Sequence, residues 1–297
     1  MHSRIGEIVD TPVAEIKHVN YLDRVYASLE LLALRDRSPV ASCDLRLAEH
    51  RIFSQNGEDG VIDALVRILG SGGGNSRSMP FFVEFGVGDG WSCNTRLLAE
   101  VRDWEGLYIE VDRDDFDKLS HRYRFSDAVT CVNASVTPEN VSEIFRAAGV
   151  PGRFGVLSID IDGQDFWVWK ALSDDFQPDI VVIEFNAEHE PGEMTVESRD
   201  VDRDAALGRR WGASLDAQIG LASAKGYELV HIDMARVNAF FVARDVLLPF
   251  RELISGRTSP GSPNYGLRGT GLADEVAFTS PNRTERETVQ ADLFIDL

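Results

Sequence analysis

The chain has 297 residues, of which 43% are hydrophobic, enough for one large core or for a core with a small appendage. Its 49 acidic and 30 basic side chains give a net charge of −19, and no basic run stands out. Nucleic-acid binding needs clustered Lys and Arg, so this composition disfavours it. Three cysteines without metal-type spacing, a start unlike a signal peptide and no apolar stretch of membrane-spanning length predict a cytoplasmic protein with reduced thiols.

The two ends of the chain differ from its middle. Residues 1–50 include "VNYLDRVYASLELLALR", whose apolar residues share one helical face. We expect a helical N-terminal arm that docks on the core or on a second copy, which would give a homodimer. Residues 251–297 are rich in Ser, Thr, Gly, Pro and charge, and are typical of a tail or lid. Residues 51–250 form the main domain.

Within the main domain, apolar runs alternate with helical segments. Five near-continuous apolar runs separated by helices predict parallel strands covered on both faces, at 81–86, 106–112, 128–136, 154–162 and 179–186. Two more strands follow each other directly, so one of them should be antiparallel; they span 227–233 and 238–245. Helices are expected over 54–70, 91–103, 114–124, 137–150, 164–174 and 212–226. The predicted fold is α/β: a Rossmann-like, doubly wound, seven-stranded sheet, mostly parallel, with a C-terminal antiparallel hairpin.

A glycine loop, "EFGVGDG" at 84–90, follows the first of these strands. Ligands of open α/β sheets lie beyond the carboxyl ends of the strands, at the switch point, so this loop marks the expected site. A dinucleotide fingerprint would need glycine at position 91, which is Trp91, and Glu84 is an unusual residue ahead of the first glycine in the NAD form. Both features are similar to the glycine loop of class I S-adenosylmethionine-dependent methyltransferases.

That donor carries a sulfonium and an ammonium but no phosphate, so bare backbone and carboxylates suit it. Glu84 and Asp89 are candidates for the cationic part, and Glu110, at the end of the second strand, for both ribose hydroxyls; Asp112 is less favoured. Glu84 and Glu110 could instead be solvated strand-end charges. The remaining expected cofactor contacts are Gln55, Asn56 and Glu58 at the methionine end, and Gly86, Gly88, Asn94, Asn133, Ala134 and Asp160. Simple helix capping is the alternative for the first of these segments.

Several motifs in combination resemble the FkbM-type methyltransferases of bacterial natural-product and glycan pathways. They are "SQNGEDG", "FVEFGVGDGWSCNTRLL", "WEGLYIEVD", "NASV", "LSIDIDGQDFWVWKAL" and "IVVIEFN", over about residues 50–245. The resemblance implies a Rossmann-like fold, S-adenosylmethionine as donor, and a hydroxyl acceptor on a sugar or secondary metabolite. It departs at "DIDGQD", where FkbM proteins often have Asp-x-Glu-Gly. This stretch is locally similar to TylF-type macrolide-sugar O-methyltransferases, which use a divalent metal.

Four oxygen-bearing side chains should meet beyond the fourth and fifth strands. Asp160 and Asp162 lie two apart and so share a side, as do Glu184 and Asn186 on a neighbouring strand about 4.8 Å away. All-oxygen ligands suit Mg²⁺, Mn²⁺ or Ca²⁺ rather than zinc. Such a cation would lower the pKa of an acceptor hydroxyl and orient it. The alternative for Asp162 is to cap the helix that begins near Gln164.

The base that removes the hydroxyl proton has three candidates. His189, just past the fifth strand, comes first because imidazole titrates near neutrality; His231, at the end of the sixth strand, is second, and Asp160 is third in a metal-free mechanism. The sequence therefore predicts an S-adenosylmethionine-dependent O-methyltransferase that acts on a small polyhydroxylated molecule. Methylation of a peptide, protein or RNA, a non-catalytic relative that binds the cofactor, and an NAD-dependent oxidoreductase remain as alternatives.

Overall fold

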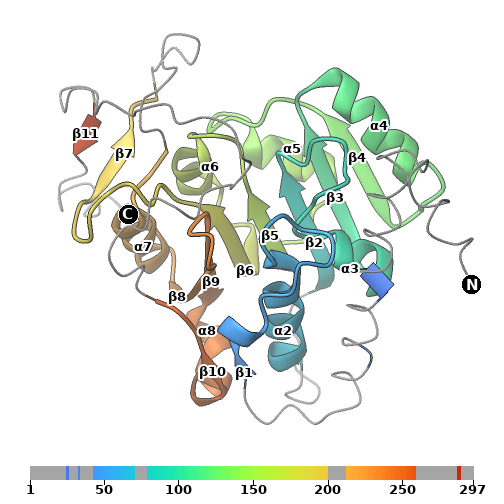
Figure 1. Cartoon of the computed structure of the whole chain (residues 1–297). Coiled ribbons are helices and arrows are strands. Elements are labelled where there is room, and N and C mark those ends of the chain that lie inside the picture. The colour runs from blue at the N-terminus through green and yellow to red at the C-terminus, as the bar shows by residue number, and fades with distance from the viewer. Residues whose placement is uncertain are drawn as a thin grey trace, which may run out of the picture.

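The computed structural model describes residues 25–26, 33, 43–70, 79–199, 212–258 and 286–288. A seven-stranded sheet lies at the centre, in the order β4-β3-β2-β5-β6-β9-β8 (Figure 1). Its strands are β2 (Met79–Phe85), β3 (Glu105–Glu110), β4 (Val129–Asn133), β5 (Arg153–Ile159), β6 (Gln177–Glu184), β8 (Tyr227–Ile232) and β9 (Asn238–Ala243).

The strand directions place a switch point at the middle of the sheet. β2 pairs in parallel with β3 on one side and with β5 on the other, and β4 and β6 extend the parallel part outward. β9 is antiparallel to both β6 and β8. The predicted Rossmann-like α/β sheet with antiparallel pairing near the C-terminus is therefore confirmed. The chain moves outward from β2 to β4 and returns to β5, so a crevice is expected where the carboxyl ends of β2 and β5 diverge.

Both faces of the sheet are apolar because helices cover both (Figure 1). One face carries Val83 and Ile159 and packs against α5, α6 and α7; the other carries Phe82 and Phe240 and packs against α2, α3, α4 and α8. The helices are α2 (Glu58–Gly70), α3 (Arg96–Val101), α4 (Arg113–Tyr123), α5 (Val141–Ala147), α6 (Asp165–Ala171), α7 (Leu215–Ala224), α8 (Arg244–Leu247) and the 3₁₀ helices η1 (Leu45–Leu47) and η3 (Leu248–Leu253).

Among the helices that begin later than predicted, α2, α3 and α5 do so because polar side chains bind backbone N–H groups ahead of them. The segment before α2 is folded around the carboxylate of Asp59, and the segment before α3 around that of Glu84. Ahead of α5, the Thr137 N–H donates to Asn140 Oδ1 at 2.8 Å, and the helix begins at Val141. These turns all lie near the carboxyl ends of the parallel strands, where the ligand crevice is expected.

Short strands outside the main sheet were not predicted. β1 (Cys43–Asp44) pairs in parallel with β10 (Ile254–Ser255), and β7 (Thr195–Glu197), in a stretch expected to be irregular, pairs with β11 (Arg286–Thr288). Most of the predicted N-terminal arm and of the tail or lid lies outside the described residues. Val25, which belongs to the arm, is buried against the core residues Ile52, Phe53 and Leu97. Docking on a second copy stays a prediction. Among the described helices, none is long and apolar enough to cross a membrane.

Candidate functional site

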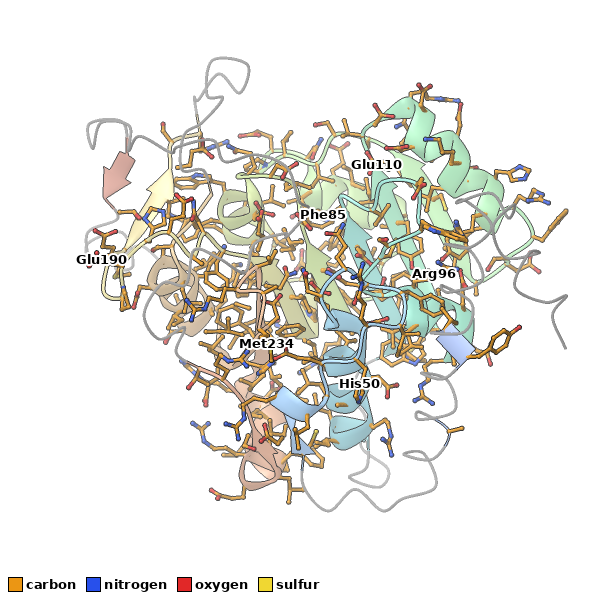
Figure 2. The ribbon with its side chains drawn as sticks, in the orientation of Figure 1. His50, Phe85, Arg96, Glu110, Glu190 and Met234 are labelled. Atoms are coloured by element: carbon orange, nitrogen blue, oxygen red, sulfur yellow. The ribbon has the colours of Figure 1, made fainter. Side chains whose placement is uncertain are left out.

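A groove with a volume of about 1200 Å³ opens at the carboxyl ends of β2, β3, β5 and β6, at the switch point of the sheet. Phe85 and Glu110, at the ends of two of these strands, mark its position (Figure 2). It brings together eight of the residues expected at the site: Gln55, Gly86, Gly88, Glu110, Ala134, Asp160, Asp162 and Glu184. The expected residues outside the described lining are Asn56, Glu58, Glu84, Asp89, Asn94, Asn133, Asn186, His189 and His231.

Two glycines of the loop serve different purposes. Both have left-handed backbones, with φ +77° at Gly86 and +54° at Gly88. A Cβ on Gly86 would lie 1.5 Å from the carbonyl oxygen of Asp160, so the loop packs directly on the end of β5. A Cβ on Gly88 would meet no atom of the described chain within 4 Å, because this residue faces the groove. Gly86 is required by packing, whereas Gly88 leaves bare backbone for a ligand.

Glu110 is fixed beside this bare backbone. One carboxylate oxygen accepts from the Gly88 N–H and the other from the Asp112 N–H, each at 2.7 Å. The residue is 6% exposed and lines the groove. A carboxylate offers about four lone-pair sites, so two such bonds leave capacity for ligand hydroxyls. The geometry suits a diol held by Glu110.

Glu84 organises the loop rather than lining the groove. Its carboxylate accepts from the N–H groups of Asn94 and Thr95 at 2.8 Å and from the Thr95 hydroxyl at 2.5 Å. Burial raises its pKa to about 7, against the opposing effect of these hydrogen bonds. Asp89 similarly accepts from the Trp91 N–H at 3.0 Å. Neither acid lines the groove, so both shape the glycine loop through these hydrogen bonds.

The segment "SQNGEDG" presents one side chain to the groove, that of Gln55. Glu58 is 1% exposed and accepts from the backbone N–H and the side-chain amide of Asn56, and from the Asn238 amide at 2.9 Å. These bonds tie the segment to the start of β9. Glu58 is therefore engaged within the protein, and Gln55 is the member of the segment placed to reach a ligand.

Two asparagines expected near the cofactor have structural partners. Asn133 donates its amide to the carbonyl oxygens of Glu110 and Val111, at 2.8 and 3.1 Å. Asn94 donates to the Ser158 hydroxyl at 3.1 Å and is buried. Each bond joins neighbouring strands or loops at the carboxyl end of the sheet. Both residues therefore stabilise the backbone around the groove and do not line it.

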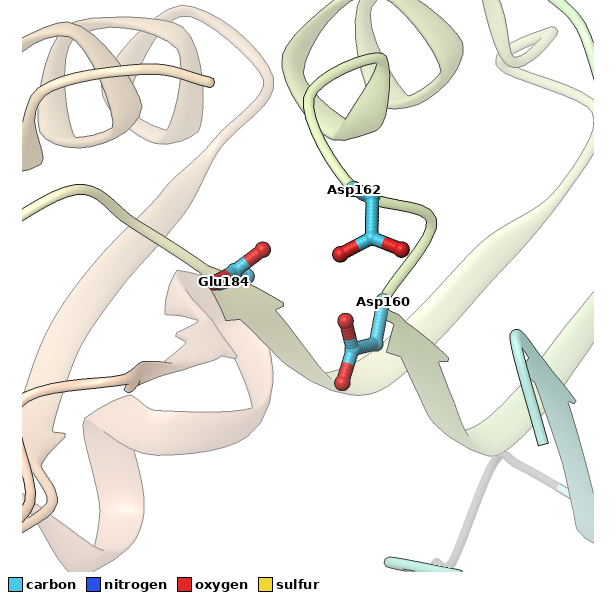
Figure 3. Close-up of side chains that lie close together, drawn as sticks. All are labelled: Asp160, Asp162 and Glu184. Carbon is cyan, nitrogen blue, oxygen red and sulfur yellow. The ribbon is translucent and has the colours of Figure 1, made fainter. Parts of the chain in front are cut away.

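Three carboxylates converge on the other side of the groove. One oxygen from each of Asp160, Asp162 and Glu184 lies within 4.8 Å of the others. Figure 3 shows Asp160 and Glu184 at the ends of two neighbouring strands, with Asp162 above them. Burial, together with the charges of Asp165 and Asp162, raises the pKa of Asp160 to about 7. Such a set of oxygen donors fits Mg²⁺, Mn²⁺ or Ca²⁺.

Asp162 is directed to this cluster because another acid closes the turn before α6. Asp165 accepts from the N–H groups of Ile161 and Gly163, each at 2.9 Å, and α6 has Gln164 as its N-cap without a side-chain bond. The capping alternative for Asp162 is therefore wrong. Asp165 was not singled out from the sequence, although an Asp in the first turn of a helix is the available signal.

The fourth expected metal ligand has a different partner. The Asn186 side-chain oxygen accepts from the Glu188 N–H at 2.9 Å, and the residue is 5% exposed. It follows the end of β6, where the chain already turns away, so the alternation that would keep it on the side of Glu184 no longer applies.

His189 lies in the loop that leads to β7. Its Nδ1 is 2.8 Å from the Thr195 hydroxyl and 3.6 Å from a Glu193 carboxylate oxygen. The ring is thereby directed toward the neighbouring strand and not into the groove lining. As a base it would need to turn away from these partners.

His231 is fully buried and bonded through both ring nitrogens. Its Nδ1 accepts from the Arg257 N–H at 3.0 Å, so the proton resides on Nε2, which donates to Glu49 at 2.9 Å. This arrangement holds a neutral imidazole and links three segments distant in sequence. Of the three candidate bases, Asp160 is the one that lines the groove.

Some groove residues were not anticipated. Residues 135–139, in the loop after β4, form one rim of the groove. Gln164, Val237 and Arg199 line other parts of it. The Arg199 guanidinium pairs with Glu139 across 60 residues of sequence. Arg199 follows β7, whose pairing gave no periodic signal, so nothing in its local sequence indicated a place at the groove.

Comparisons with known proteins gave only distant likenesses. No family model and no curated protein matches the chain. The N-terminal domain of EvdMO1, solved in the presence of SAH and D-fucose, is 13% identical, with 63% of this chain and 82% of that chain covered and a TM-score of 0.40. An O-methyltransferase family protein from Burkholderia thailandensis is also 13% identical, with 76% and 70% covered and a TM-score of 0.37. The CurJ carbon methyltransferase is 11% identical, with 65% and 57% covered and a TM-score of 0.40. Likeness at this level assigns no activity to the chain.

Proposed function

We propose that the protein is a class I methyltransferase of the FkbM type that takes S-adenosylmethionine as donor and methylates a hydroxyl of a small polyhydroxylated molecule, such as a sugar, glycan or natural product. The observation that carries this proposal is the position of Glu110. Its carboxylate is held by the Gly88 N–H, beside bare glycine backbone at the switch point of the sheet. A diol next to a flat nucleoside fits that arrangement.

The charge of the groove supports a cationic donor over a dinucleotide. Among the described lining residues Arg199 is the cationic side chain, against the acids Glu110, Glu139, Asp160, Asp162 and Glu184. A pyrophosphate would be repelled by this set, whereas a sulfonium and an ammonium would be attracted. Trp91, which replaces the third glycine of a dinucleotide loop, also favours a cationic donor over a dinucleotide.

Each groove residue then has a defined task toward the donor. Glu110 accepts the ribose hydroxyls, and Ala134, whose N–H donates to the Glu110 carbonyl oxygen at 3.1 Å, leaves room beside it for the adenine ring. Gly86 and Gly88 let the backbone approach, and Gln55 reaches the methionine end. S-adenosylmethionine, when bound, supplies a methyl group activated by its sulfonium. The carboxylates beyond β5 and β6 favour the positive end of the donor by their charge.

Asp160 is the proposed base. Its pKa, raised to about 7 mainly by burial, matches a group that takes a proton near neutral pH. It lies at the end of β5, against the glycine loop, where acceptor and methyl group must meet. The proton of the acceptor hydroxyl would pass to the Asp160 carboxylate as the oxygen bonds to the methyl carbon and the carbon–sulfur bond of the donor breaks, which would leave S-adenosylhomocysteine.

We further propose a divalent cation at the carboxylate cluster, with Mg²⁺ favoured over Mn²⁺ and Ca²⁺. Asp160, Asp162 and Glu184 would hold it, and it would lower the pKa of the acceptor hydroxyl. In that route Asp160 would be a ligand and not the base, and the hydroxyl proton would pass to water in the groove. Activity that persists in excess EDTA, with no metal retained by the protein, would remove this part of the proposal and leave the metal-free route.

Calorimetry tests the donor. The protein should bind S-adenosylhomocysteine and should not bind NAD. Glu110→Ala should weaken S-adenosylhomocysteine binding by about a hundredfold or more, because two hydrogen bonds to a charged group are lost, each worth about 1.5–3 kcal/mol. Glu143→Ala, which removes an exposed acid from α5, is the matched control and should bind as the wild type does. Tight binding of NAD without binding of S-adenosylhomocysteine would refute the proposal.

A further inference from the structure

A second cavity lies at the opposite end of the sheet from the groove. Its volume is about 510 Å³, within the range of small-molecule sites. Residues at the starts of β5, β6 and β8 and at the end of the antiparallel β9 line it: Arg153, Gln177, Tyr227 and Ala243. Ligands of the main site in such folds lie at the carboxyl ends of the strands, so this cavity is separate from the proposed reaction.

The base of the cavity is aromatic and rigid. Trp169 and Tyr227 pack edge to face with ring centroids 5.7 Å apart, and Phe176 adds a third ring. All three are less than 9% exposed. Beside them Gly226 has φ +86°, and a Cβ there would meet no atom of the described chain within 4 Å. A flat apolar group can therefore approach the backbone at Gly226.

Lys225 brings an incompletely compensated charge to this cavity. Its side chain is 13% exposed, and its ammonium donates to the Leu172 carbonyl oxygen at 3.0 Å. The Asp174 carboxylate is 3.8 Å away but 98% exposed, so water screens it. Burial lowers the pKa of Lys225. An ammonium has three N–H donors, so this one retains capacity for a ligand.

Arg244 supplies a second cation on the other side of Gly226. Its backbone N–H donates to the Gly226 carbonyl oxygen at 2.9 Å, which keeps the two residues adjacent. Its guanidinium donates to the Ser223 hydroxyl at 2.7 Å, and no carboxylate of the described chain pairs with it. Arg153, the third cation of the cavity, is by contrast neutralised by Asp179 and Asp245.

We infer that this cavity is a second ligand site that takes a small organic oxyanion with a flat apolar body. The oxyanion, a phosphate or a carboxylate, binds Lys225 and Arg244, and the flat body covers the aromatic base beside Gly226. The two cations come from different elements, the end of α7 and the start of α8, and flank the same open space. In a chain of net charge −19, such a pair facing a cavity is a specific feature.

The probes are 4-nitrophenyl phosphate and 4-nitrobenzoate, which carry the two oxyanions, with uncharged 4-nitrobenzyl alcohol for comparison. Titrations of the full chain should show saturable one-to-one binding of at least one anion, and S-adenosylhomocysteine should not displace it. Lys225→Met and Arg244→Gln should each weaken that binding by about tenfold or more. Lys118→Met, an exposed lysine on α4, is the matched control and should leave it unchanged.

Circular dichroism and thermal unfolding establish that each variant is folded before it is compared. Absence of saturable binding of both anions up to about 10 mM would overturn the inference, since such affinity lies below that of a specific site. So would equal binding of 4-nitrobenzyl alcohol, which would remove the role of the charge. Binding that both variants retain, or that S-adenosylhomocysteine displaces, would place the anion elsewhere and would also overturn it.

Discussion

Gly86→Ala should destabilise the protein more than any other substitution in the glycine loop. The residue has φ +77°, a conformation that costs an L-residue about 1–2 kcal/mol. Its new Cβ would lie 1.5 Å from the carbonyl oxygen of Asp160, and the two residues directly follow Phe85 and Ile159, which are paired in the sheet. Relief of that contact requires the loop to leave the end of β5, and overpacking of this kind costs about 1–3 kcal/mol.

The two terms together give a loss of about 2–5 kcal/mol in the free energy of unfolding. For a chain of this size each kcal/mol lowers the melting temperature by about 2–4 °C, so a fall of about 4–20 °C is expected. Thermal unfolding followed by circular dichroism measures the shift. Urea unfolding, compared through its midpoint at constant slope, gives the free energy independently.

Gly88→Ala provides the matched control. Gly88 has a similar backbone, with φ +54°, but its Cβ would enter open space. We expect a loss of only about 1–2 kcal/mol, from the backbone term alone, with a large loss of S-adenosylhomocysteine affinity because the methyl group enters the groove. Equal destabilisation by the two substitutions, or a melting temperature unchanged in Gly86→Ala, would refute the reasoning that packing on Asp160 requires the first glycine.

Three further outcomes are expected. Asp59→Asn should cost about 2–4 kcal/mol in urea unfolding, because Asp59 accepts from three backbone N–H groups and a hydroxyl of residues 52–54, and an amide nitrogen cannot accept; a loss below about 1 kcal/mol would contradict this. Asp162→Ala and Glu184→Ala should each abolish Mn²⁺ binding measured by electron paramagnetic resonance, while Asn186→Ala keeps it; loss in Asn186→Ala alone would contradict the assignment of ligands. Stability should fall as pH rises from about 4 to 7, since the folded-state pKa values near 6 or 7 exceed the unfolded values near 4, and this contribution, complete below the unfolded values, is lost as pH passes through the folded ones; a melting temperature that rises with pH over this range would contradict this. The carboxyls concerned, all raised first by burial, are Asp59, Glu84, Asp160, Asp165 and Asp233.

The sheet could be predicted because its signal is local. Each parallel strand is a near-continuous apolar run, and both faces are indeed covered by helices. The residues that line the groove at strand ends, such as Glu110, Asp160 and Glu184, could be predicted for the same reason: the end of a strand in such a fold points to one edge of the sheet.

What could not be predicted depends on contacts between distant segments. The sequence gives no sign that Glu84 and Glu58 are engaged within the protein. Each accepts hydrogen bonds from residues in irregular turns, and such turns have no periodic pattern in the sequence. His231 sits at a strand end as expected, yet β8 lies at the edge of the sheet beyond β9, where Glu49 and Arg257 meet the imidazole. Glu49 and Arg257 are 182 and 26 residues away from His231 in the sequence, so no local pattern predicts these contacts.

The most direct test of the central claim is a crystal structure of the protein grown with S-adenosylhomocysteine. We predict the ligand in the groove at the switch point, with its ribose hydroxyls on the Glu110 carboxylate and its methionine portion toward Gln55. Density for the ligand at another place, or ribose hydroxyls bound by residues other than Glu110, would contradict the account.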